Sequence, residues 1–212
     1  YFFKEENELK HNDAIPIVCV HGYLHNRTAW WWFFRFLRSK GYRGAYRACD
    51  LYSPFISIER CADILDRYIR DVCRETGKDE VILIGHSMGG LVSSYYAENI
   101  AKDVKVRAVM TLGSPLHGTL LAALGYGDNA RAMSVYSSFH ENLSSCRMCS
   151  HIPYHAFASR IDNMIVPWDS ACLKEVEGET KVYNDKGHLA LLYSREIFEE
   201  IYRKIEDSNR KV

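Results

Sequence analysis

Three short apolar runs constrain the fold of this chain more than any other feature of its sequence. They are Ile15 to Val20, Val81 to Ile84 and Val106 to Leu112. A run of this length, bounded by turn residues, indicates a strand that is buried on both faces. Ser57 to Thr76 places its apolar residues on one helical stripe, and Gly77 follows as a stop signal. Buried strands that alternate with helices predict an α/β fold with a mostly parallel sheet flanked by helices.

The rest of the chain extends this alternation. Further strands are predicted at Ala45 to Leu51, His155 to Ile161 and Thr180 to Tyr183. Further helices are predicted up to Lys40, from Gly90 to about Ala101, and from Ser194 to Glu206. Thr28 is the predicted cap of the first of these helices. Residues 114–153 have an irregular, mixed pattern. Because no repeat, low-complexity tract or linker interrupts the pattern, we expect residues 1–212 to form a single domain.

Composition excludes several classes of protein. The chain carries 27 Lys and Arg against 27 Asp and Glu, so it lacks the basic surplus that nucleic-acid binding requires. No apolar run approaches the roughly 20 residues of a membrane-spanning helix. These features predict a soluble domain with a small-molecule site. The first residue is Tyr1 rather than Met, so we expect that an upstream segment was removed, which leaves the compartment open.

A glycine-rich hexapeptide follows the second of the three apolar runs. It reads Gly85-His86-Ser87-Met88-Gly89-Gly90 and lies between a predicted strand and a predicted helix. A sharp strand-to-helix turn lifts a serine above the sheet, and flanking glycines let the new helix pass close to the strand. The G-x-S-x-G pattern alone also occurs in ordinary glycine-rich turns. In this context it predicts that Ser87 is a nucleophile.

In this setting the hexapeptide resembles the α/β-hydrolase superfamily, and in particular its small bacterial, triacylglycerol lipase-like lipases and esterases. Three further stretches match in the same order: 20–23 (VHGY) resembles the oxyanion loop, 111–119 (TLGSPLHGT) the lipase segment after the next strand, and 187–192 (GHLALL) the catalytic-histidine loop. The resemblance covers roughly residues 15–206. It implies a near-minimal α/β-hydrolase fold in which residues 114–153 form a short cap.

A serine nucleophile needs a base, and the base needs an orienting acid. In this superfamily the partners follow in the order Ser, acid, His. His188 follows the last predicted strand and is the predicted base. Asp162 follows the preceding predicted strand, just ahead of a Val-Pro pair, and is the preferred acid, while Asp169 and Asp185 remain alternatives. The resemblance also implies an oxyanion hole formed by the backbone N–H groups of Tyr23 and Met88.

Aromatic and aliphatic residues near these motifs are candidates for substrate binding. Trp32 lies off the stripe of its predicted helix, which favours either extra packing against a loop or one wall of an acyl groove. Leu116 and Leu120 begin the predicted cap and are further candidates. A cap of this size favours a partly open site and esters with short-to-medium acyl chains.

Cysteines and histidines near the end of the cap form a separate group. The run Cys146-x-x-Cys149-x-His151-x-x-x-His155 has zinc-ligand residue types, but its spacing is too short for a usual structural site. A Cys146–Cys149 disulfide is a second alternative, and free thiols are the default. We therefore predict neither a metal nor a cofactor.

Together these features predict a serine hydrolase of carboxylic esters that forms an acyl-enzyme. The partner is then a small ester or lipid molecule. An acyltransferase or thioesterase with the same triad, and a non-catalytic binding domain on this fold, remain as alternatives. The sequence leaves the oligomeric state open.

Overall fold

A six-stranded sheet forms the centre of the computed structural model, which describes residues 14–51, 53, 55–174 and 177–210. Its order is β2-β1-β3-β4-β5-β6, and all neighbouring strands are parallel. The strands are β1 Ile17–Val20, β2 Tyr46–Cys49, β3 Glu80–His86, β4 Lys105–Leu112, β5 Tyr154–Ser159 and β6 Glu179–Tyr183. The predicted fold class is confirmed.

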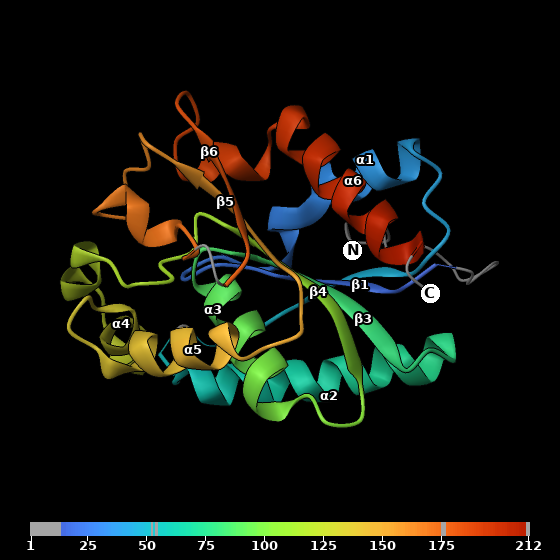
Figure 1. Ribbon diagram of the computed structural model, residues 1–212, viewed down its shortest axis with the longest axis horizontal. Helices are drawn as coiled ribbons and strands as arrows, with labels where there is room; N and C mark the ends of the chain where they lie inside the picture. The colour runs from blue at the N-terminus through green and yellow to red at the C-terminus, as the bar shows by residue number, and fades with distance from the viewer. Residues whose placement is uncertain (1–13, 52, 54, 175–176, 211–212) are drawn as a thin grey trace.

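Helices cover both faces of this sheet (Figure 1). Helices α1 Trp31–Ser39 and α6 Arg195–Arg210 lie on one face, and α2 Ile58–Thr76 and α3 Met88–Tyr95 lie on the other. Alternate residues of β1 belong to the two cores: Ile17 and Cys19 pack with α1 and α6, whereas Val18 and Val20 pack with α2 and α3. Burial on both faces explains why this strand is continuously apolar in the sequence.

The ends of α2 follow the sequence signals. The Ser57 side chain accepts a hydrogen bond from the backbone N–H of Arg60, and Gly77 adopts a left-handed conformation after the last turn. The predicted cap at Thr28 is wrong. A 3₁₀ turn, η1 Arg27–Trp30, precedes α1, and Asn26 caps it by accepting from the N–H of Thr28.

Short helices replace the irregular structure predicted for residues 114–153, which we call the cap segment. They are the 3₁₀ turn η3 Leu120–Leu124, α4 Gly127–Met133 and α5 Ser138–Met148. A fully buried ion pair between Arg147 and Glu177, 3.3 Å apart, ties α5 to the loop before β6. These helices are short and carry little amphipathic pattern, so their stability depends on such tertiary contacts.

The remaining elements complete the chain. A π-helical turn, η2 Tyr96–Ile100, continues α3, and two 3₁₀ turns lie in the loops after β5 and β6, η4 Trp168–Ala171 and η5 Leu189–Leu192. None of the helices in the described ranges is long and apolar enough to cross a membrane. All seven cysteines fall within those ranges and are free, so the alternative of a Cys146–Cys149 disulfide is wrong.

Candidate active site

The turn between β3 and α3 holds Ser87 in an unusual backbone conformation. Its φ is 53° and its ψ is −126°, a combination that few non-glycine residues adopt. Two backbone hydrogen bonds fix the turn: the N–H of Ser87 donates to Leu112 O, and the N–H of Gly90 donates to Ser87 O. Backbone strain held in place by its surroundings is typical of functional sites. The predicted sharp strand-to-helix turn is present.

The glycine at position 89 is required by a close approach of α3 to the sheet. A Cβ atom there would lie 2.3 Å from the carbonyl oxygen of Val20. The start of α3 therefore passes directly over the end of β1. This is also the point at which the strand order reverses, because the chain moves from β1 out to β2 and then back to β3. Ligands of open parallel sheets bind at such switch points, beyond the carboxyl ends of the strands.

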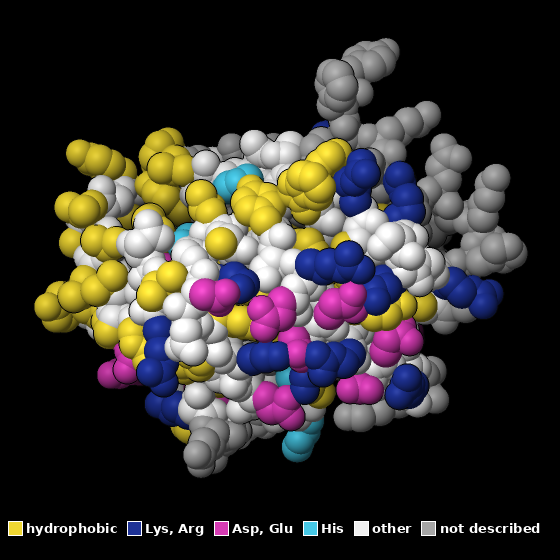
Figure 2. Space-filling view, turned by 90° about the horizontal axis from the view of Figure 1, so that it is seen from above, with side chains coloured by type: hydrophobic (Ala, Val, Ile, Leu, Met, Phe, Trp, Pro, Cys, Tyr) yellow, Lys and Arg dark blue, Asp and Glu magenta, His cyan; other side chains and the backbone are white. Residues whose placement is uncertain are grey.

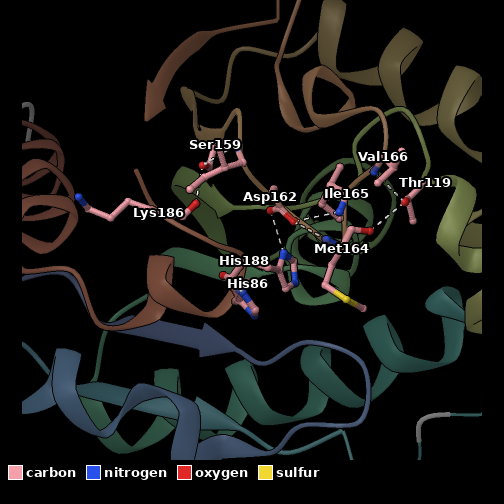
Figure 3. A network of polar contacts seen from close by, with 10 residues as sticks. His86, Thr119, Ser159, Asp162, Met164, Ile165, Val166, Lys186 and His188 are labelled. Carbon is pink, nitrogen blue, oxygen red and sulfur yellow. Dashed lines mark hydrogen bonds and ion pairs between the residues drawn. The ribbon is translucent and has the colours of Figure 1, made fainter. Parts of the chain in front are cut away.

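His188 and Asp162 meet at the same edge of the sheet. Nδ1 of His188 lies 2.9 Å from Oδ2 of Asp162, and both side chains are buried. The other carboxylate oxygen, Oδ1, accepts the backbone N–H groups of Met164 and Ile165 (Figure 3). One oxygen is thus held by the loop, and the second is directed to the histidine.

The two alternative acids lie elsewhere. Asp169 is exposed in η4. Asp185 is exposed and pairs with Lys186 Nζ at 2.5 Å, and this hydrogen bond lowers the pKa of the Asp185 carboxyl. Among the three sequence candidates, Asp162 is the one that contacts His188.

Side-chain hydrogen bonds hold the loops that carry Asp162 and His188 (Figure 3). The Thr119 hydroxyl donates to Met164 O at 2.9 Å and accepts from the N–H of Val166 at 3.0 Å. The Ser159 hydroxyl donates to Lys186 O, two residues before His188. The loop that carries Asp162 is therefore hydrogen-bonded to the cap segment through Thr119. The strand before it is hydrogen-bonded to the loop that carries His188 through Ser159.

The nucleophile turn contacts the loops on either side of it. A Cβ at Gly22 would lie 2.9 Å from Ser87 Cβ, so the loop after β1 packs against the serine. A Cβ at Gly113, the residue after β4, would lie 3.0 Å from Asp162 Oδ2 and 3.2 Å from His188 Nδ1. The predicted nucleophile, base and acid therefore gather around the carboxyl ends of β1, β3 and β4.

His86 has no role that its sequence pattern predicts. Its Nε2 donates to the backbone carbonyl of His188 at 3.2 Å, and the two imidazole rings are 4.6 Å apart. Burial lowers the pKa of His86 well below its usual value, which keeps the ring neutral. Since the contact joins the end of β3 to a loop that is far away in the sequence, no local pattern could have revealed it.

Tyr23 and Met88, the predicted oxyanion donors, lie on opposite sides of Ser87 in the chain. Met88 is the first residue of α3, and the first N–H groups of a helix have no partner within the helix. Tyr23 lies in the loop after β1, where Leu24 has a φ of 54°. The Tyr23 hydroxyl donates to Tyr126 O at 2.9 Å and so ties this loop to the cap segment.

The predicted substrate residues lie in different environments. Leu116 is fully buried in the core that packs with α2 and α3. Leu120 and Trp32 are about half exposed, Leu120 at the start of η3 and Trp32 on α1. A cavity of about 280 Å³ is lined by Gly22, Leu24 and Met88 together with Leu51 and polar residues such as His25 and Asp50.

Exposed apolar side chains gather at one end of the face shown in Figure 2. Figure 2 shows hydrophobic side chains gathered at the left, the end at which Figure 1 shows α4 and the neighbouring loops, while charged side chains lie toward the middle. The most exposed large apolar side chains in the described ranges are Tyr136, Leu124, Tyr126 and Leu24. In the ranges that the structure describes, no group of three or more His, Cys, Asp or Glu is arranged to hold a metal ion.

Comparisons with known proteins agree with this architecture. Residues 15–143 match the family model described as the alpha/beta hydrolase fold. A triacylglycerol lipase from Pseudomonas fragi is 32% identical over 118 residues, which are 52% of this chain and 38% of that lipase. The match therefore spans well under half of the length of that relative.

Two solved structures illustrate the similarity of fold. The mature lipase BlEst2 of Bacillus licheniformis superposes with a TM-score of 0.75 at 20% identity, covering 94% of this chain and 96% of that one. A thermophilic esterase from Thermogutta terrifontis gives a TM-score of 0.68 at 15% identity, with 94% and 92% covered. At such identities the superpositions establish a common fold.

Proposed function

Because the chain belongs to the α/β-hydrolase fold family, we propose that it is a lipase- or esterase-type serine hydrolase that cleaves carboxylic esters through an acyl-enzyme. One observation carries the proposal: the 2.9 Å contact between His188 Nδ1 and Asp162 Oδ2, beside a serine held at a φ of 53°. The proteins with which the chain shares this fold include lipases and an esterase, which supports the same class of reaction.

The first half of the reaction transfers the acyl group to the enzyme. Ser87 Oγ attacks the ester carbonyl carbon while Nε2 of His188 takes the hydroxyl proton. The carbonyl oxygen becomes an oxyanion, which accepts hydrogen bonds from the N–H groups of Met88 and Tyr23. The bond to the alkoxide then breaks, and His188 returns its proton to the leaving oxygen to give the free alcohol.

The second half of the reaction hydrolyses the acyl-enzyme. His188 takes a proton from water, and the resulting hydroxide attacks the acyl carbonyl. A second oxyanion forms at the same donors. Collapse of this intermediate releases the carboxylic acid, and His188 returns the proton to Ser87.

Asp162 has an orienting role in this scheme. Its Oδ2 accepts the Nδ1 proton of His188, which leaves the Nε2 lone pair available as the base. Its negative charge also stabilises the imidazolium that forms when His188 takes the serine proton. The two backbone N–H groups on Oδ1 keep the carboxylate from turning away.

The proposal extends to esters with short-to-medium acyl chains. The cavity beside Gly22 and Met88 has about 280 Å³, at the lower limit of the range for small-molecule pockets. Rates across p-nitrophenyl esters of increasing chain length test this point. We expect an optimum at short-to-medium chains, and a sharp preference for long-chain emulsions would contradict it.

Two substitutions test whether the cavity holds the acyl chain. Leu24 lines the cavity, whereas Leu124 is similarly exposed in η3 and does not line it. Leu24→Trp should move the chain-length optimum to shorter esters, and Leu124→Trp should leave the optimum unchanged. An equal shift in both variants would argue against this cavity as the acyl site.

Hydrolysis of p-nitrophenyl butyrate tests the function itself. Wild-type protein should release p-nitrophenol, and Ser87→Ala should lose the activity by a factor of about 10⁴ or more. Ser145→Ala is the matched control, since Ser145 is exposed on α5 and donates to Glu141 O. Activity that survives in Ser87→Ala would refute the proposed nucleophile.

A further inference from the structure

The imidazole of His21 is buried directly after β1, at the start of the loop that carries Tyr23. Its Nδ1 lies 2.9 Å from the carbonyl oxygen of Gly22, and its Nε2 lies 3.1 Å from the backbone N of Leu51. Both ring nitrogens are thus engaged with backbone groups. The ring links the end of β1 to the loop that follows β2.

These two contacts define the protonation state of the ring. A carbonyl oxygen can only accept, so Nδ1 carries a proton, and a backbone N–H can only donate, so Nε2 offers its lone pair. His21 is therefore the neutral Nδ1–H tautomer. Burial lowers the pKa of His21 and favours the same neutral form.

The nearby carboxylate of Asp50 does not change this assignment. Asp50 Oδ1 lies 3.2 Å from His21 Nε2, and Oδ2 lies 3.8 Å from Nε of Arg27. A proton on Nε2 would suit Asp50, but it would oppose the N–H of Leu51. With Nε2 as the acceptor, the donor at Nδ1 remains directed at Gly22.

The carbonyl of Gly22 belongs to the same planar peptide group as the N–H of Tyr23. The two bonds point in opposite directions across a trans peptide, so fixing the oxygen fixes the direction of the N–H. The Gly22 oxygen accepts from His21 Nδ1 and also from the backbone N–H of His25 at 3.3 Å. Two donors therefore prevent this peptide group from turning over.

We infer that His21 is a positioning residue for the oxyanion hole: by holding the Gly22 carbonyl, it keeps the Tyr23 N–H directed toward the oxygen that becomes negative during attack by Ser87. This inference rests on the proposed function. A donor that is already oriented stabilises the transition state without reorganisation during the reaction. His21 itself contacts no reacting atom.

Two substitutions separate the two contacts of the ring. The amide nitrogen of an asparagine side chain can take the place of Nδ1, so His21→Asn keeps the donor to Gly22 O and loses the acceptor for Leu51. The amide oxygen of a glutamine side chain can reach the position of Nε2, so His21→Gln keeps that acceptor and loses the donor. A purely structural role would make the two variants equivalent.

The readout is kcat and KM for p-nitrophenyl butyrate, with thermal unfolding as the control for stability. We expect His21→Gln to lower kcat by at least tenfold, toward the factor of about 10² to 10³ that follows loss of one oxyanion donor, with KM within twofold. His21→Asn should keep kcat within about fivefold of wild type. Both variants should unfold at similar temperatures, because each loses one hydrogen bond of the ring.

Several results would overturn the inference. These are an unchanged kcat in His21→Gln, an equal loss of kcat in both variants, or an effect confined to KM. If His21→Gln does not fold, the inference is tested with His21→Asn alone. A tenfold loss of kcat in folded His21→Asn would then contradict the role of the donor. An inert wild-type protein would refute the proposed function together with the inference, whereas an active wild type beside an unaffected His21→Gln refutes the inference alone.

Discussion

Nδ1 of His188 lies 2.9 Å from Oδ2 of Asp162, although 26 residues separate them in the chain. The contact depends on two loops that leave adjacent parallel strands, β5 and β6, at the same edge of the sheet. Thr119 and Ser159 hold those loops through hydrogen bonds to backbone atoms. The pair is therefore oriented by the scaffold before any substrate binds.

Replacing the acid while keeping its shape tests this orientation. Asp162→Asn can still accept the N–H groups of Met164 and Ile165 through Oδ1, so the loop should keep its conformation. The amide cannot fix the same tautomer of His188 or stabilise the imidazolium, and kcat should fall by about 10³ to 10⁴. Asp185→Asn is the control, and its kcat should stay near that of wild type. Comparable losses in the two variants would argue against Asp162 as the acid.

The close packing of Gly22 against the nucleophile leads to a second prediction. A Cβ at this position would lie 2.9 Å from Ser87 Cβ and 3.2 Å from His86 Nδ1. In Gly22→Ala the loop after β1 must move away from Ser87, so kcat for p-nitrophenyl butyrate should fall by about 10² or more. A circular dichroism spectrum like that of wild type would show that the sheet is retained. Wild-type kcat in this variant would contradict the proposed oxyanion loop.

The attachment of the cap segment gives a prediction about stability. Arg147 and Glu177 are both fully buried, and Ser144 Oγ and the backbone N–H of Lys174 also donate to Glu177. Glu177→Gln leaves the Arg147 charge buried without a counter-charge, which should lower the free energy of unfolding by about 3 to 5 kcal/mol. Asp128→Asn, which breaks the exposed pair with Arg131, should cost less than about 1 kcal/mol. Denaturant titrations that give equal losses would refute the buried pair as the main attachment.

The buried imidazole of His140 should lower the stability of the folded protein in acid. Burial lowers the pKa of His140, in α5, from 6.5 to about 4. Above pH 6.5 the ring is neutral in both states and has no effect on the pH dependence of folding. Below pH 6.5 the histidine is protonated in the unfolded chain but stays neutral in the folded chain. The free energy of unfolding therefore falls until about pH 4.

The size of this effect can be measured by substitution. At pH 4.5 the contribution of His140 amounts to about 2 to 3 kcal/mol of lost stability. His140→Asn should therefore show a shallower decline of unfolding free energy between pH 7 and pH 4.5 than wild type. Identical slopes would mean that His140 takes up its proton as readily in the folded chain as in the unfolded one.

Much of this architecture could be predicted from the sequence because the deciding signals are local. The apolar run at Ile17–Val20 and the cap and stop residues of α2 depend on neighbours within a few positions. The turn at Ser87 likewise needs a strand, flanking glycines and a helix that are contiguous in the chain. Chain order then led to Asp162 and His188.

The parts that could not be predicted depend on contacts between distant segments. His21 and His86 owe their positions to Leu51 and to the carbonyl of His188, and neither pairing has a local pattern. Helix α5 of the cap segment has no clear apolar period in the sequence, and its buried contact with Glu177, through Arg147, comes from a distant segment. Leu116 was predicted at the start of the cap, but it lies in the core that packs with α2 and α3.

Covalent labelling with a fluorophosphonate tests the central claim most directly, because the probe reacts with a serine only when it is activated. Intact-protein mass spectrometry should show one adduct on the wild-type chain, and peptide mapping should assign it to Ser87. The adduct should be absent from Ser87→Ala and present on Ser145→Ala. A folded wild-type protein that takes up no label, or a Ser87→Ala variant that still does, would contradict the account.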